Sequence, residues 1–208
     1  MGERVEVVGD GNCWAYAVLA AMGWLQHGGG PVPTLRDRRF ASRMRRMVVH
    51  WFEQPQNAAL REDELLLSGT WAAFRQRMLR DPTYDASGRC TRQGGWSGTA
   101  AYLAVASRWC IDIVCWNRQH LDSRVAVRVV RPDGSQLVPL DVVRASDCCN
   151  ARCRSLLCAE HLYGSTGGGR RRRLVHVEYN GTNHYAAIVE AGWQQKPPHH
   201  TIADVDES

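Results

Sequence analysis

Residues 10–16 read Asp10-Gly11-Asn12-Cys13-Trp14-Ala15-Tyr16, a polar glycine loop that leads directly into an apolar stretch. Asn12 is suited to cap a helix that begins at Cys13, and the apolar residues that follow predict a core helix reaching Leu25. The helix macrodipole and the free N–H groups at this end would favour a Cys13 thiolate and an adjacent oxyanion. The segment predicts a reactive cysteine, with a buried structural cysteine as the alternative.

A histidine far downstream offers a base for this thiol. Asn180-Gly181 predicts a hairpin turn between strands at 174–179 and 184–190, which places His184 at the start of the last strand. Because side chains alternate along a strand, His184 and Ala186 would share one face. A thiol beside an imidazole becomes an effective nucleophile, so Cys13 and His184 together indicate a cysteine hydrolase.

Three motifs, in order, resemble those of the ovarian-tumour (OTU) family of cysteine proteases, many of which are deubiquitinases. Residues 10–16 look like its cysteine box, Trp96-Ser97-Gly98 resembles its Trp-Gly-Gly region, and Asn183-His184-Tyr185 resembles its histidine box. The resemblance covers roughly residues 5–190. It implies an α/β (α+β) fold of the papain-like OTU type, with a central, mostly antiparallel sheet flanked by helices.

The resemblance also implies roles for single residues. Cys13 would be the nucleophile, and His184 the general base and then acid, in cleavage after the C-terminal glycine of ubiquitin or a ubiquitin-like modifier. Trp96 would shape the core near the site, and Tyr185 would flank the substrate channel or pack beneath the histidine. No cofactor is implied. The oxyanion hole would consist of the backbone N–H groups of Asp10, Gly11, Asn12 and Cys13.

One position departs from the family pattern. Many members carry Asp or Asn two residues after the histidine, where it fixes the imidazole tautomer, but Ala186 has no polar atom. On this basis Asp10 joins Cys13 and His184 in the predicted catalytic set, and Ala186→Asp would leave activity unharmed. Without an orienting residue, the site would work as a dyad. The other candidates to orient the histidine are Glu6, Asn183 and Asn180.

Bulk composition predicts one soluble domain. The chain has 208 residues, 44 % of them hydrophobic, but no apolar run of the roughly 18–20 residues that cross a membrane. The first ten residues lack the plan of a signal peptide. We expect a catalytic domain at 1–193, a disordered tail at 194–208, no membrane partner, and a cytoplasmic or nuclear location.

The basic residues are almost all arginine. The 26 basic residues include one lysine, Lys196, which leaves 25 arginines, and the net charge is +5. Three explanations stay open. A GC-rich coding sequence favours arginine, a protein that works around ubiquitin gains from few acceptor lysines, and an arginine excess would suit an acidic partner.

Residues 145–173 break the strand pattern and predict an insertion. Cys148, Cys153, Cys158 and His161 would be a weak zinc site, because they form no paired Cys-x-x-Cys unit; free thiols or disulfides are the alternatives. Arg170–Arg173 forms a basic run that is either a solvated loop or a nucleic-acid contact. The alternative function is therefore an inactive or nucleic-acid-binding OTU-like module.

The remaining segments show clear periodicities. Thr34 would cap a helix at 35–53, in which Phe40, Met44 and Val48 face the core and the arginines form a solvated face. A turn at 132–135 predicts a hairpin. The other predicted elements are a strand at 4–8, helices at 61–80 and 99–109, and strands at 111–116, 124–130 and 136–143.

Overall fold

A computed structural model describes residues 2–25, 32–59, 61, 69–95, 97, 99–117, 126–130, 136–137, 173–180 and 183–190. Several predictions lie outside these residues. They are the role of Trp96, the insertion up to residue 172 with Cys148, Cys153, Cys158, His161 and the arginines from 170 to 172, and the tail at 194–208.

A six-stranded sheet carries the site, with strand order β1-β8-β7-β4-β5-β6. Within the described residues, four of its five strand pairs are antiparallel and the β4–β7 pair is parallel. This confirms the mixed fold class and the mostly antiparallel sheet. The strands are β1 (Gly2–Val5), β4 (Ile111–Asn117), β5 (Ala126–Val130), β6 (Gln136–Leu137), β7 (Arg173–Tyr179) and β8 (Tyr185–Glu190).

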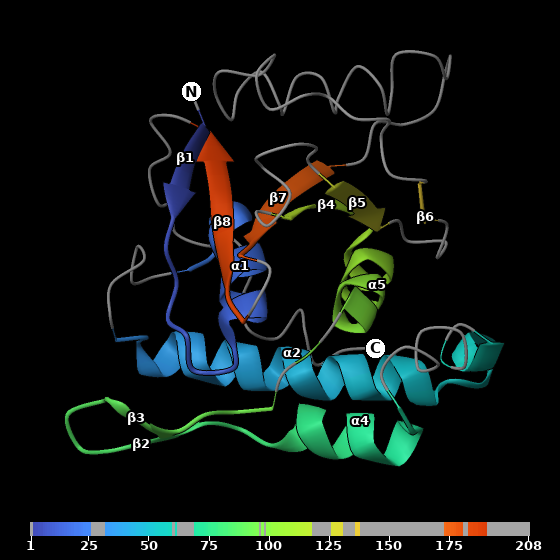
Figure 1. Cartoon of the computed structure of the whole chain (residues 1–208). Helices are drawn as coiled ribbons and strands as arrows, with labels where there is room; N and C mark the ends of the chain where they lie inside the picture. Colours follow the sequence, from blue (N-terminus) through green and yellow to red (C-terminus); the bar gives the residue numbers. More distant parts are fainter. Residues whose placement is uncertain are drawn as a thin grey trace.

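Strands β1 and β7 flank β8, as Figure 1 shows. Arg4 of β1 and His176 of β7 both stand opposite Ile188. Two residues along, Glu178 stands opposite Ala186, on the same face of the sheet because side chains alternate. β1 ends at Val5 rather than at the predicted residue 8, and the chain then runs to the loop before Cys13.

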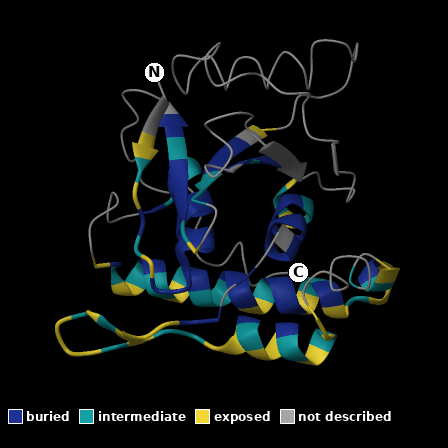
Figure 2. Cartoon of the chain, viewed as in Figure 1, coloured by how far each residue is buried: buried dark blue, intermediate teal, exposed yellow. Residues whose placement is uncertain are grey.

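Helices α1 (Cys13–Ala21) and α5 (Thr99–Trp109) lie between the sheet and a long helix (Figure 1). Every side chain from Cys13 to Ala20 is buried, which confirms the predicted core helix (Figure 2). α1 ends before the predicted Leu25, because Gly23 adopts φ of 77° and turns the chain.

Helix α2 (Leu35–Glu53) has the predicted bounds and crosses below α1 and α5 (Figure 1). Thr34 and Asp37 form a capping box at its start. Its far side is covered by α4 (Trp71–Leu79) and by the hairpin of β2 (Thr83–Tyr84) and β3 (Cys90–Arg92), while a short 3-10 helix, η1 (Pro55–Asn57), follows it. Of the helix predicted at 61–80, α4 is the part with described bounds.

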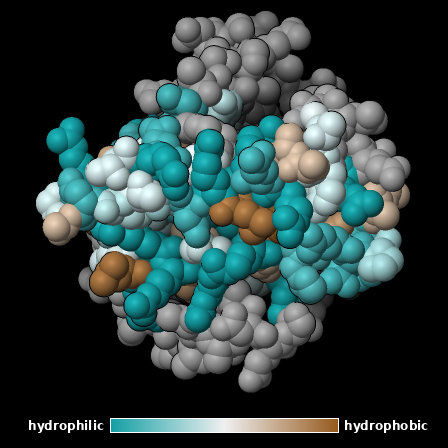
Figure 3. Space-filling view, turned by 90° about the horizontal axis from the view of Figure 1, so that it is seen from below, coloured by the Kyte–Doolittle hydropathy of each residue, from teal (hydrophilic) through white to brown (hydrophobic). Residues whose placement is uncertain are grey.

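The face seen from below is mostly hydrophilic, with hydrophobic residues scattered singly (Figure 3). The large apolar side chains exposed among the described residues are Val32, Leu35 and Leu79. None of the helices that the structure describes is both long and apolar enough to span a lipid bilayer.

Candidate active site

Cys13 is the first residue of α1, and its side chain is fully buried. Burial raises the pKa of its thiol to about 11, although hydrogen bonds from the backbone N–H groups of Tyr185 and Trp14 act in the opposite direction. The thiolate expected from the helix start is therefore wrong for this conformation. Loss of hydration outweighs the helix terminus, and the resting state is a protonated thiol.

Tyr185 joins the last strand to the nucleophile. Its ring is buried. The ring centroid lies 5.4 Å from that of Tyr102, in an edge-on contact, and 4.8 Å from that of Tyr179. This packing fixes the N–H group that faces the Cys13 sulfur. The backbone of Tyr185 thus acts on the nucleophile, and His184 precedes it, just outside β8.

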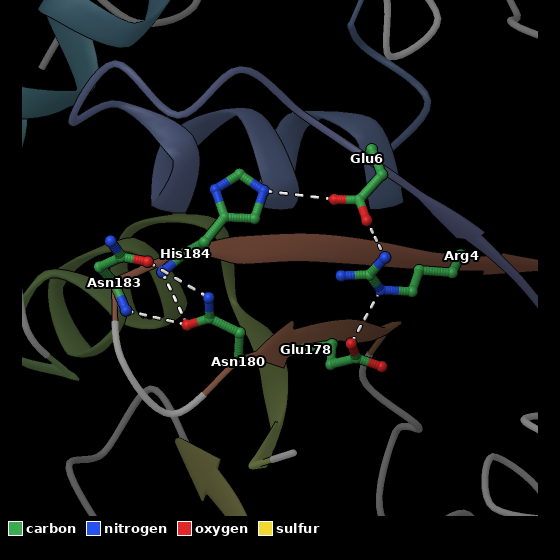
Figure 4. A network of polar contacts seen from close by, with 6 residues as sticks. All are labelled: Arg4, Glu6, Glu178, Asn180, Asn183 and His184. Atoms are coloured by element: carbon green, nitrogen blue, oxygen red, sulfur yellow. Dashed lines mark hydrogen bonds and ion pairs between the residues drawn. The ribbon is translucent and has the colours of Figure 1, made fainter. Parts of the chain in front are cut away.

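The imidazole of His184 is held at Nε2. This nitrogen lies 3.3 Å from Oε2 of Glu6 (Figure 4). A carboxylate at this distance favours a proton on Nε2, which would leave the lone pair on Nδ1. Nδ1 faces Gly9, where an added Cβ would lie 3.5 Å away. Among the described residues no hydrogen bond joins Cys13 Sγ to this ring.

Arg4 connects Glu6 to the sheet. Its Nη1 donates to Oε1 of Glu6, and its Nε donates to Oε1 of Glu178 at 2.8 Å (Figure 4). Since Arg4 is on β1 and Glu178 on β7, the side chain crosses β8 on the face that carries Ala186. Burial, and then the charge of Arg4, lower the pKa of His184.

The hydrogen bonds given for the two turn asparagines are made to backbone N–H groups and to each other, and none is made to the imidazole. Oδ1 of Asn180 accepts hydrogen bonds from the N–H groups of Asn183 and His184, each at 2.9 Å. Its amide also donates to Oδ1 of Asn183 at 3.2 Å. Of the four candidates to orient His184, the structure brings Glu6 alone to a ring nitrogen.

Asp10 is buried, and its carboxylate bonds to the loop and to two tyrosines. Its Oδ1 accepts from the N–H of Asn12 at 2.8 Å, and its Oδ2 accepts from the hydroxyls of Tyr16, at 3.2 Å, and Tyr84. The structure therefore places Asp10 as an anchor of the nucleophile loop and does not bring it into the catalytic pair. The sequence analysis assigned neither tyrosine a role, and Tyr84 is 74 residues from Asp10, so its contact has no local signal.

The N–H groups of the loop divide into two kinds. That of Asn12 is occupied by Asp10, which removes it from the predicted oxyanion hole. Those of Asp10, Gly11 and Cys13 have no hydrogen-bond partner among the described residues. Gly11 has φ of 90°, and a Cβ there would lie 2.5 Å from the carbonyl oxygen of Gly94. Glycine is thus required for the loop to pack against residues 94–95.

Arg45 is a site residue that the sequence analysis missed. It was expected on the solvated face of α2, but it is 1 % exposed and bonds to the nucleophile loop. Its Nε donates to Oδ1 of Asn12, so the side chain of Asn12 does not cap α1 as predicted. Its position supplies the missed signal, because it is four residues after buried Ala41 and three before buried Val48.

The described residues contain no cluster of three or more His, Cys, Asp or Glu side chains suited to a metal ion. The described cysteines Cys13, Cys90, Cys110 and Cys115 are free thiols.

Three solved structures resemble the chain. A domain of OTUD1 has 17 % sequence identity and a TM-score of 0.47, and the match covers 91 % of this chain and 86 % of that one. A Wolbachia pipientis deubiquitinase bound to ubiquitin has 9 % identity, coverage of 90 % and 94 %, and a TM-score of 0.41. A Hazara virus domain bound to ubiquitin has 13 % identity, coverage of 90 % and 80 %, and a TM-score of 0.43.

All three are OTU domains. This is the family that the three motifs of the sequence resemble. No family model and no curated protein matches the sequence. Because every TM-score is below 0.5, the function proposed below depends on the residues of this chain.

Proposed function

We propose that this chain is a thiol-dependent deubiquitinase of the OTU type, an isopeptidase that cleaves after the C-terminal glycine of ubiquitin or a ubiquitin-like modifier. The observation that carries the proposal is the arrangement of three elements. α1 begins at Cys13, a hydrogen bond from the backbone of Tyr185 lowers the pKa of its thiol, and Nε2 of the adjacent His184 lies 3.3 Å from Oε2 of Glu6. This arrangement supports a common site for the cysteine and histidine boxes.

The proposed reaction begins with proton transfer from the thiol of Cys13 to Nδ1 of His184. The sulfur attacks the carbonyl carbon of the terminal glycine, and the free N–H groups of Gly11 and Cys13 stabilise the oxyanion. His184 then protonates the leaving amine as the C–N bond breaks. Next it takes a proton from water, whose oxygen attacks the thioester, and it returns a proton to the departing sulfur of Cys13.

Glu6 has the orienting role in this mechanism. Its carboxylate, 3.3 Å from Nε2, would keep the proton on that nitrogen and the lone pair at Nδ1, the nitrogen that must receive the thiol proton. Asp10, through its bonds to Asn12, Tyr16 and Tyr84, stabilises the loop that carries the N–H donors. In this assignment Glu6, from the N-terminal segment, takes the orienting role that Asp or Asn has in many family members at the position of Ala186.

The buried thiol adds a conformational step. Cys13 has no exposed surface and a pKa of about 11, so a substrate carbonyl reaches it only after the loops around it move. Substrate binding would open this access and bring Sγ within reach of Nδ1. Enzyme hydrogen bonds that are long without substrate often shorten in the complex.

A ubiquitin derivative with a C-terminal electrophile tests the proposal on the full chain. We expect a covalent adduct at Cys13, no adduct for Cys13→Ala, and an unchanged adduct for Cys90→Ala, since Cys90 lies in β3. A panel of diubiquitins would then define linkage preference. Absence of the adduct in the unmodified chain, together with salt-sensitive binding of nucleic acid, would favour the non-enzymatic alternative.

A further inference from the structure

Arg45 is a buried cation that the mechanism above does not use. It lies on α2 with 1 % of its surface exposed. A guanidinium has five N–H donors, and each one here has an acceptor. Nε donates to Asn12 Oδ1, Nη1 to the carbonyls of Met78 and Arg77 at 3.2 and 3.4 Å, and Nη2 to those of Gly11 and of Gly95, the latter at 2.7 Å.

These acceptors come from three separate segments. Arg77 and Met78 belong to the last turn of α4, Gly95 belongs to the loop after β3, and Gly11 and Asn12 immediately precede the nucleophile. The five acceptors are four backbone carbonyls and one amide, so none of them carries a full negative charge. Burial lowers the pKa of Arg45, although the charges of Asp81 and Asp10 act in the opposite direction. A helix arginine that only filled space would be better replaced by an apolar residue.

The contacts act on one peptide unit of the loop. The carbonyl of Gly11 accepts from Arg45, and the N–H of the same peptide, which belongs to Asn12, donates to Asp10. The unit is therefore held at both ends. With its orientation set, the N–H groups on either side of it, those of Gly11 and Cys13, have no partner among the residues that the structure describes.

We infer that Arg45 is a positioning residue that fixes the Gly11–Asn12 peptide and so directs the N–H groups of Gly11 and Cys13 at the reacting carbonyl. The inference rests on the proposed thiol mechanism and deepens it. Arg45 acts through the loop and does not touch substrate. Lysine has three donors on a single nitrogen, so it cannot bridge the three segments in this way.

The test compares Arg45→Lys with Phe74→Leu in the full chain. Phe74 is buried on α4, and its ring centroid lies 5.7 Å from that of Phe52 on α2. Its substitution therefore weakens the packing of α4 against α2 without removing a contact to the nucleophile loop. Both variants are assayed where circular dichroism shows them folded. For Arg45→Lys we expect kcat on a ubiquitin substrate to fall about tenfold or more with KM within about twofold. For Phe74→Leu we expect kcat near that of the unmodified chain.

Hydrogen exchange provides a second readout that needs no activity. Loss of the bridge should speed amide exchange in residues 10–13 for Arg45→Lys, but not for Phe74→Leu. If Arg45→Lys does not fold, Asn12→Ala replaces it. This variant removes one of the two loop contacts, and we expect the same exchange signature with a smaller loss of kcat.

The outcomes test the positioning role of Arg45 and the proposed function separately. Equal kcat and equal exchange at residues 10–13 for Arg45→Lys and Phe74→Leu would overturn the positioning role. If the unmodified chain cleaves no ubiquitin substrate, the proposed function fails, and exchange then decides whether Arg45 holds the loop. Faster exchange at 10–13 in Arg45→Lys supports that role, and unchanged exchange rejects it.

Discussion

Oε2 of Glu6 lies 3.3 Å from Nε2 of His184, although the carboxylate belongs to the N-terminal segment and the histidine to the last hairpin. The antiparallel pairing of β1 with β8 brings these two ends of the chain together. In the proposed mechanism this carboxylate, which follows β1 in the chain, orients the imidazole, so alanine at position 186 is compatible with activity.

Removing this carboxylate should weaken catalysis without weakening the fold. Glu6 is 54 % exposed at its side chain, so Glu6→Ala should leave the free energy of unfolding nearly unchanged. Because His184 loses its tautomer control, kcat should fall by about tenfold or more, and Glu6→Gln, which keeps an acceptor, should fall less. Steady-state assays measure this, with Glu53→Gln as the control at an exposed carboxylate on α2. Equal activity of Glu6→Ala and Glu53→Gln would remove Glu6 from the mechanism.

Arg4 should set the acid limit of activity. Its positive charge disfavours the protonated imidazole and lowers the pKa of His184, and its contact with Glu6 offsets the opposing carboxylate. Arg4→Gln should raise that pKa, so a larger fraction of His184 is protonated in mildly acid solution. The acid limb of kcat/KM against pH should then move to higher pH.

The pH profile of Arg39→Gln provides the control, because Arg39 is exposed on α2. An acid limb of Arg4→Gln that stays in place or moves to lower pH would contradict the electrostatic role. Among the described residues, the charged groups of this network are Glu6, Arg4 and Glu178, so Glu178→Gln shows how much of the shift arises through the far end of Arg4.

The family pattern predicts that Ala186→Asp leaves activity unharmed, but the structure predicts a loss of stability. Ala186 is 1 % exposed and stands opposite Glu178, on the face that Arg4 crosses. A carboxylate there would be buried beside a like charge and would obstruct Arg4. We expect a loss on the order of 3 kcal/mol in the free energy of unfolding. Urea denaturation measures it, and Ala186→Ser should lose less. Stability equal to that of Ala186→Ser would show that the strand face accommodates the charge.

Substitutions at two glycines with similar φ angles can distinguish the cost of backbone strain from the cost of a steric clash. Gly11 has φ of 90° and Gly69 has φ of 92°, but an added Cβ meets a carbonyl at the first position and nothing within 4 Å at the second. Gly69→Ala should cost about 1–2 kcal/mol from backbone strain alone. Gly11→Ala should cost a further 1–3 kcal/mol or so from the clash and should lose activity. Thermal denaturation and steady-state assays check this, and equal losses of stability would argue against close packing of the two loops.

Local sequence was sufficient where the structure depends on neighbours along the chain. Thr34 as a helix cap predicted the start of α2, and the apolar run after Cys13 predicted a buried α1. The turn after Tyr179 predicted the β7–β8 hairpin that presents His184. Each of these signals spans only a few residues, so capping, burial and turn chemistry can be derived without knowing the remainder of the fold.

The sequence by itself determined the mixed fold and nominated Cys13 and His184 as the reacting pair. Tertiary structure alone decided that Glu6 faces the imidazole, that Asp10 is an anchor, and that the resting thiol is protonated. These outcomes depend on strand order and on complete desolvation, which arise from contacts between residues far apart in the chain. The same holds for Arg45, whose five donors are satisfied because three distant segments converge on one guanidinium.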